Sequence, residues 1–170
     1  TVRQATQGLA NYIVSQNGQE KGVAIAHDSR LMHDEFTEET ALCLAANGIK
    51  VYIYPELVPT PMLSFAVRRL NCSSGIIITA SHNPSKYNGF KCYDPNGYQM
   101  TDEAAEKTYN YIQNIDMFSG VKTMSFDDAL AEDMVDFIED WLYDEFYAKV
   151  ISSLVNPDAI KKAGLKVIYT

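Results

Sequence analysis

A hydroxyl, an imidazole and a carboxamide stand next to one another in residues 79–84, whose sequence is Thr-Ala-Ser-His-Asn-Pro. The preceding residues 75–78, Gly-Ile-Ile-Ile, form the apolar, β-branched run that is typical of a buried strand. In open α/β sheets ligands bind beyond the carboxyl ends of the strands. We therefore expect Ser81, His82 and Asn83 to lie in a loop that lines a binding site.

Cationic side chains near this loop indicate which chemistry it suits. Residues 88–91, Asn-Gly-Phe-Lys, predict a turn and then a short strand that carries Lys91. A hydroxyl with an ammonium group nearby suits phosphoryl transfer better than hydrolysis, because that transfer mainly needs positioning and charge neutralisation. We expect Arg30, Lys86 and Lys91 to form a local basic pocket for a small anion, although the net charge of the chain is −8.

Strands and helices alternate along the chain, which predicts an α/β fold. Apolar periodicity and turn residues predict helices at 2–16, 33–47, 61–70, 101–115 and 127–153 and strands at 22–26, 51–54, 75–79 and 89–93. Thr60 is expected to cap the third helix, with Pro61 in its first position. The pair of strands at 75–93 favours one antiparallel edge, so we predict a three-layer α/β/α domain with a mixed, mostly parallel sheet.

The last residues of the chain predict a second, incomplete element. A short helix should end at Lys162 with Gly164 as its cap, and residues 165–170, Leu-Lys-Val-Ile-Tyr-Thr, favour a strand without a following turn. A lone strand needs a sheet to join. We therefore expect one domain over 1–164 and the start of a truncated second domain at 165–170.

Composition excludes several classes of protein. The chain has 170 residues, of which 46% are hydrophobic, which suffices for one sizeable core. The acidic balance argues against nucleic acid as a partner, and no apolar run is long enough for a membrane span. Three cysteines, Cys43, Cys72 and Cys92, lack metal-ligand spacing and predict reduced, buried thiols in a cytoplasmic protein.

Four motifs in chain order resemble the α-D-phosphohexomutases, the family of phosphoglucomutase and phosphomannomutase. Residues 79–84 resemble the phosphoserine loop of that family, and residues 88–91 fit the family downstream of the loop. Residues 26–30, Ala-His-Asp-Ser-Arg, resemble its first loop, and 59–61, Pro-Thr-Pro, resemble a helix start. Members have four domains, and this chain resembles the first alone, so the resemblance implies that domains two to four are missing.

The resemblance implies a reaction for Ser81. This residue would carry a phosphoryl group, pass it to a hexose phosphate and take another back, with a hexose 1,6-bisphosphate as intermediate and activator. The result would be an exchange of phosphate between the 1- and 6-hydroxyls of the sugar. The resemblance also implies Mg²⁺, to which this chain would contribute only a phosphate oxygen on Ser81, with the carboxylate ligands in the missing second domain.

Roles for the neighbouring residues follow from the same resemblance. Lys91 and Arg30 would bind the phosphoryl group and stabilise its charge, and Lys91 would also move a proton at the sugar hydroxyl. His82 would orient the phosphate or shuttle a proton, and Asn83 would fix the loop and bind phosphate. Arg30 also has a simpler alternative, an ion pair with Asp28. His27 and His33 are interpreted as structural or surface residues.

Three functions remain open from the sequence. The first is the phosphohexomutase activity of a complete protein, in which case the isolated segment would be inactive. The second is a non-catalytic module that binds phosphate or another anion at the Ser81 loop. The third is a serine hydrolase that uses Ser81 and His82, which is disfavoured because adjacent residues rarely place a base correctly and no Gly-x-Ser-x-Gly elbow is present. Sugar selectivity, oligomeric state and the phosphorylation state of Ser81 are not encoded in these motifs.

Overall fold

The computed structural model describes residues 1–168 and divides the chain into two compact units. The first unit runs from Thr1 to Ile138 and the second begins at Glu139. The first unit contains the sheet and all of the predicted site residues.

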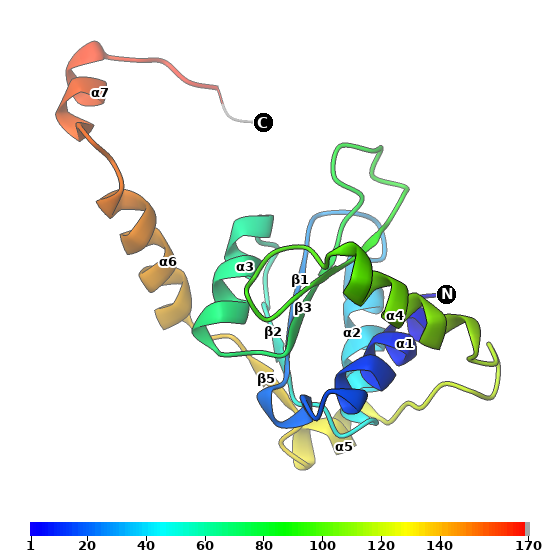
Figure 1. The fold of residues 1–170 in the computed structure, drawn as a ribbon. Helices are drawn as coiled ribbons and strands as arrows, with labels where there is room; N and C mark the ends of the chain where they lie inside the picture. The colour runs from blue at the N-terminus through cyan, green and yellow to red at the C-terminus, as the bar shows by residue number, and fades with distance from the viewer. Residues whose placement is uncertain (169–170) are drawn as a thin grey trace. The chain divides into compact units, whose positions relative to one another are not determined.

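One mixed sheet forms the centre of the first unit (Figure 1). Its strands are β1 (Val23–His27), β2 (Val51–Ile53), β3 (Ser74–Ile78), β4 (Phe90–Tyr93) and β5 (Val135–Phe137). Their order across the sheet is β4-β3-β1-β2-β5, and only β4 is antiparallel to its neighbour. The prediction of a mostly parallel sheet with one antiparallel edge is therefore confirmed.

Helices cover both faces of this sheet, which confirms the three-layer α/β/α domain (Figure 1). One face packs against α3 (Thr60–Arg69), and the other lies under α1 (Val2–Ser15) and α2 (His33–Ala45), with α4 (Asp102–Gln113) packed on α1. No helix in residues 1–168 is long and apolar enough to cross a membrane.

The core explains why β1 and β3 are almost continuously apolar. Every residue of both strands is buried, as expected for central strands that are covered on two faces. Ile76 and Ile78 belong to the cluster formed with α1 and α2. Gly75, which precedes Ile76, lies on the α3 side, where a Cβ atom would come within 2.5 Å of Val67.

The predicted helix at 127–153 is wrong. The structure has three elements there: α5 (Phe126–Ala131), β5 and α6 (Asp140–Ser152). Asp133 takes a left-handed conformation with φ of 55°, which ends the helical path, and Val135 then pairs with Val51. A strand of three residues is too short to show alternation, and the apolar residues around it happen to repeat at helical spacing.

Two smaller expectations also need correction. The residue that caps α3 is Pro59 rather than Thr60, so the helix begins one residue earlier than expected. Residues 165–168 of the expected terminal strand form no strand, and 169–170 lie outside the described residues. The second unit instead consists of α6 and α7 (Pro157–Ala163), and the predicted cap at Gly164 is confirmed by its φ of 58°.

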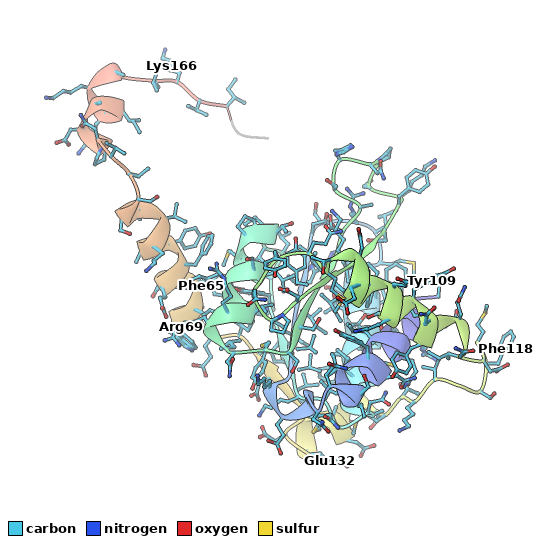
Figure 2. The ribbon with its side chains drawn as sticks, viewed as in Figure 1. Phe65, Arg69, Tyr109, Phe118, Glu132 and Lys166 are labelled. Atoms are coloured by element: carbon cyan, nitrogen blue, oxygen red, sulfur yellow. The ribbon has the colours of Figure 1, made fainter. Side chains whose placement is uncertain are left out.

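The connection from α4 to α5 lies at the periphery of the first unit, where Phe118 is 94% exposed (Figure 2). Its course is set by local polar contacts. The Oδ1 atom of Asp116 accepts hydrogen bonds from the backbone of Phe118 and Ser119, and the Lys122 N–H donates to Gln7 Oε1 at 2.9 Å. These contacts anchor the connection to α1 without extending the core.

The three cysteines are free thiols, as predicted; Cys43 and Cys72 are buried, whereas Cys92 is only partly buried. Desolvation raises the pKa of each to about 12. Because the thiolate is the reactive species, folding should protect all three. We expect the native chain at pH 8 to react slowly with a thiol-specific chromogenic disulfide and the urea-unfolded chain to release three equivalents at once. Rapid release of an equivalent from the native chain would contradict the buried environment.

Helices α1 and α4 approach so closely that Gly8 has no room for a side chain. A Cβ atom there would lie 2.2 Å from Ile112 Cγ1. We expect Gly8→Ala to lower the free energy of unfolding by about 1–3 kcal/mol, because overpacking outweighs a helix-propensity gain of at most about 1 kcal/mol. Urea unfolding measures the effect.

The matched control for Gly8 is a double-mutant cycle. In an Ile112→Ala background the 2.2 Å contact is removed and only the backbone of residue 112, at 3.1 and 3.2 Å, stays close, so Gly8→Ala should cost clearly less there. An equal cost of Gly8→Ala in both backgrounds would show that the two helices do not meet at this point.

Candidate functional site

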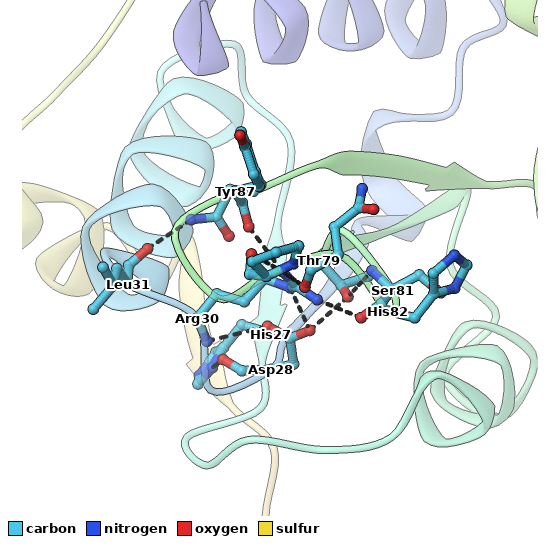
Figure 3. Close-up of polar contacts among 11 residues, drawn as sticks. His27, Asp28, Arg30, Leu31, Thr79, Ser81, His82 and Tyr87 are labelled. Carbon is cyan, nitrogen blue, oxygen red and sulfur yellow. Dashed lines mark hydrogen bonds and ion pairs between the residues drawn. The ribbon is translucent and has the colours of Figure 1, made fainter.

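Two loops leave the sheet side by side at the point where its strand order reverses. After β1 the chain crosses to β2 on one side and then returns to β3 on the other. Residues His27 and Ile78, the last of β1 and β3, are level with each other in the parallel register. Such a reversal leaves a crevice at the carboxyl ends of the strands, and the loops 28–32 and 79–89 begin at this crevice (Figure 3).

Arg30 joins these two loops. Its side chain is 7% exposed, and its Nε atom donates to Asp28 Oδ2 at 3.0 Å. Its Nη1 atom donates to the carbonyl oxygens of Asn83, Pro84 and Tyr87 at 2.8, 3.0 and 2.9 Å, and its Nη2 atom donates to that of Ser81 (Figure 3). The planar guanidinium thus supports the Ser81 loop from below through four backbone carbonyls.

Thr79 and Asp28 fix the backbone of Ser81. The buried Thr79 Oγ1 donates to Asp28 Oδ2 at 2.5 Å and accepts the Ser81 N–H at 3.0 Å. Ser81 itself has a φ of 58°, a left-handed conformation that is unfavourable for a residue with a Cβ atom. The hydrogen bond from its N–H and the contact of its carbonyl with Arg30 hold the residue in that conformation.

The far end of the loop returns close to its start. The Thr79 N–H donates to the Gly89 carbonyl at 3.0 Å, and a Cβ atom at Gly89 would come within 2.5 Å of the Thr79 carbonyl oxygen. Asn88 Nδ2 donates to the Leu31 carbonyl at 2.6 Å, which ties the loop to residues 28–32 a second time. Gly89 is therefore required by a close backbone approach, whereas the turn predicted at Asn88-Gly89 is not formed and the nearest turn lies at residues 85–86.

Ser81, His82 and Asn83 lie on the exposed side of this loop. The Ser81 Oγ atom is 3.4 Å from His82 Nδ1, at the outer limit of a hydrogen bond. In the described part of the chain no acidic side chain hydrogen-bonds to His82, so the third member of a hydrolase triad is missing there. The exposed serine hydroxyl is suited to accept a group from a ligand in solution.

The predicted cations are not equally placed. Arg30 is directed into the underside of the loop and its charge is paired with Asp28. Lys91 lies on β4 opposite Ile77, and its ammonium makes no hydrogen bond or ion pair within residues 1–168. Lys86 lies 5.2 Å above the Tyr87 ring. No contact among the described residues joins either lysine to Ser81, so their roles stay predictions.

Sequence reasoning missed the positioning roles of Asp28 and Thr79. Both stand directly after a buried strand, at the two strand ends that parallel pairing brings together. A hydroxyl and a carboxylate at adjacent strand ends could have been recognised as a polar pair before the structure was known.

Residues 1–118 match a protein-family model that is described as "Phosphoglucomutase/phosphomannomutase, alpha/beta/alpha domain I". The chain is 38% identical over 170 residues to a phosphoglucomutase of Staphylococcus saprophyticus and 33% identical over 172 residues to one of Staphylococcus aureus. Each alignment covers all of this chain, and the chain spans 30% of the length of either relative.

Solved structures share the fold. A phosphoglucomutase/phosphomannomutase family protein from Burkholderia thailandensis matches 90% of this chain and 31% of its own, with a TM-score of 0.67 and 24% identity. The open form of parafusin, a phosphoglucomutase of Paramecium, matches 76% of this chain and 24% of its own, with a TM-score of 0.64 and 22% identity. At these identities the likeness concerns the fold alone.

The Thr79 hydroxyl provides a test of the loop geometry. We expect Thr79→Val to lower the free energy of unfolding by about 1–3 kcal/mol, because the substitution keeps the shape but removes the acceptor of the Ser81 N–H and one of the two side-chain donors to Asp28 Oδ2. Urea unfolding gives the free energy, and amide hydrogen exchange at Ser81 should accelerate.

Thr37→Val is the matched control for Thr79. Thr37 is equally buried, with 5% exposure, but its Oγ1 atom has no hydrogen-bond partner in the described structure. The same substitution there should be neutral or stabilising. Equal effects at the two positions would contradict a specific role for the Thr79 hydroxyl.

Proposed function

The chain belongs to the phosphoglucomutase/phosphomannomutase family, as its α/β/α domain I, and we propose on that premise that Ser81 carries a phosphoryl group between the 1- and 6-hydroxyls of a hexose. The observation that carries the proposal is the exposed Ser81 hydroxyl on a loop whose backbone is held from below by Arg30 and Thr79. Phosphoryl transfer depends mainly on placing the two oxygens in line, and a rigid loop serves that requirement.

The chemical step balances with the residues assigned to it. The phosphorus–oxygen bond of phospho-Ser81 breaks while a sugar hydroxyl forms a new one; that hydroxyl gives its proton to a base, and the leaving Ser81 oxygen takes up one proton. The product is a hexose bisphosphate and a free Ser81 hydroxyl. After the sugar has turned over, the Ser81 hydroxyl gives up its proton as it accepts the other phosphate, and the departing sugar oxygen takes up one proton.

We assign neutralisation of the phosphoryl charge to side chains on and next to the Ser81 loop. Lys91 is the first candidate, because its ammonium has no partner among the described residues, and His82 adjoins the Ser81 oxygen at 3.4 Å. Asn83 is assigned to loop geometry through its carbonyl, which accepts from Arg30. We assign Arg30 to positioning of the loop, because its charge is paired with Asp28 and its other donors bind backbone carbonyls.

Whether Mg²⁺ fits this site depends on which oxygen ligands the chain places beside Ser81. Asp28 is the carboxylate beside Ser81, and its oxygens already accept from Arg30 and Thr79. This chain therefore offers one ligand, an oxygen of a Ser81 phosphate, and the carboxylates must come from a further part of the protein. The ion would supply charge neutralisation at the phosphoryl oxygens. For the same reason we propose that the 170-residue chain alone does not turn over substrate.

The alternative is a module that binds phosphate without catalysis. The exposed Ser81 loop, with Lys86 and Lys91 nearby, supports this phosphate-binding module as much as it supports the mutase. Titration calorimetry with glucose 1-phosphate, run beside a mutase assay on the longer polypeptide, separates the two: binding without turnover in that polypeptide would favour the module.

Replacement of the proposed carrier is the direct test. In the longer polypeptide, Ser81→Ala should reduce the mutase rate by at least about 10³-fold, because the covalent route is lost. Incubation with a labelled hexose bisphosphate should add one phosphoryl group to the parent protein and none to the variant, as read by intact mass.

Ser85→Ala is the matched control, since Ser85 lies on the same loop, is exposed and contributes only its carbonyl to Leu31. This variant should retain both turnover and labelling. Full turnover by Ser81→Ala, or labelling that moves with Ser85, would reject the assignment.

A further inference from the structure

Three potential metal ligands lie close together at the two ends of the loop 28–32, which carries Arg30. They are His27 at the end of β1 and His33 and Asp34 in the first turn of α2, and their ligand atoms all lie within 4.8 Å of one another. The proposed phosphoryl chemistry uses none of them. The sequence alone led us to interpret both histidines as structural or surface residues.

His27 is oriented in the way that metal-binding histidines usually are. The residue is 4% exposed, and its Nδ1 atom lies 3.3 Å from the Asp28 carbonyl oxygen. If Nδ1 carries the proton and donates to this carbonyl, Nε2 keeps a free lone pair for an ion. A second hydrogen bond of this kind, to a backbone carbonyl, commonly fixes the tautomer of a ligating imidazole.

His33 carries a buried nitrogen that is unsatisfied. Its Nδ1 atom has no hydrogen-bond partner in the described structure, although Asp34 Oδ1 is only 3.0 Å away. That contact has ion-pair distance without hydrogen-bond geometry. An unpaired buried imidazole nitrogen beside a carboxylate is costly in the absence of a proton or a cation between them.

The geometry can close around one ion. Ligands of a tetrahedral ion at about 2.0–2.1 Å lie about 3.4 Å apart, so ligand separations of up to 4.8 Å must shrink by up to about 1.4 Å. The rings of His27 and His33 are stacked at 4.5 Å with 14° between their planes, and the His33 ring must tilt out of this stack. The side chains of His33 and Asp34 are 26% and 80% exposed, so both are free to turn while β1 holds His27.

We propose that His27, His33 and Asp34 form a binding site for one divalent ion such as Zn²⁺. Two imidazoles and one carboxylate favour Zn²⁺, Ni²⁺ or Cu²⁺, whereas Mg²⁺ prefers an all-oxygen shell. Three protein ligands leave a fourth position for water. The site is separate from the Mg²⁺ that the proposed function implies, and it does not rest on that function.

Such an ion would join β1 to α2 across the loop that carries Arg30. Residues 28–32 lie between the ligands His27 and His33, so the ion would close a short chain segment at both ends. Because only the folded chain brings the three ligands together, binding stabilises it. The ion would thereby stiffen the loop that supports Ser81.

The test uses this chain with Zn²⁺, Co²⁺ and Mg²⁺ in separate titrations. Calorimetry should give one Zn²⁺ per chain, and at about a hundredfold excess over the dissociation constant Zn²⁺ should raise Tm by about 5–10 °C. Co²⁺ should give the strong visible absorption of a four-coordinate site. Mg²⁺ should change neither readout.

Variants locate the ligands. His33→Gln and Asp34→Asn should each abolish the Tm shift and the Co²⁺ absorption, with circular dichroism confirming that both variants fold. His82→Gln is the control, because His82 is the only histidine outside the cluster and should leave both signals unchanged. Absence of Zn²⁺ binding, binding that survives His33→Gln, or binding that is lost with His82→Gln would each overturn the proposal.

Discussion

The candidate site depends on the hydrogen bonds that the Arg30 guanidinium donates to Asp28 and to the Ser81 loop. The guanidinium is buried, it pairs with Asp28, and it donates to four carbonyl oxygens of the facing loop. Without Arg30 the carbonyls of Ser81, Asn83 and Tyr87 would have no protein partner within residues 1–168, whereas that of Pro84 would keep the Tyr87 N–H. A lysine could not replace Arg30, because one ammonium with three donors cannot reach carbonyls that are spread along the loop. Because Arg30 binds the loop from its buried side, the side chains of Ser81, His82 and Asn83 stay accessible to a ligand.

This arrangement also explains why a serine can hold an unfavourable backbone conformation at residue 81. A left-handed φ for a residue with a Cβ atom persists only when its surroundings over-determine it. Here the N–H of Ser81 is bound by Thr79 and its carbonyl by Arg30, and both partners are anchored to Asp28. Because β1 and β3 pair in parallel with their ends level, Asp28 and Thr79 meet without further loop structure. The parallel register of β1 and β3 thus helps to fix the backbone conformation of Ser81.

The sequence was informative where an element is long, buried or marked by glycine and asparagine. Strands β1 and β3 and helices α1 and α2 were predicted within about two residues, and the Ser81 loop was placed at the correct edge of the sheet. Sequence-based prediction failed at β5, because a strand of three residues between two helices is too short to show a pattern. It also failed at 165–168, where apolar β-branched residues form no strand. The partners of Arg30 were unpredictable for another reason. Backbone carbonyls carry no residue identity, so a sequence pattern cannot show that a guanidinium will bind four of them.

Burial of Arg30 has a consequence for the charge balance at Ser81. The ion pair with Asp28 cancels much of the guanidinium charge at distances beyond the pair, and the Nε, Nη1 and Nη2 atoms of Arg30 each donate to a carboxylate or carbonyl oxygen. A phosphoryl group on Ser81 adds a charge of about −1.5 to −2 on the opposite, solvated side of the loop. Under the proposed function, neutralisation of this charge would fall to groups with free donors, of which the half-buried Lys91 is the candidate, and Arg30 would act through the backbone of residue 81.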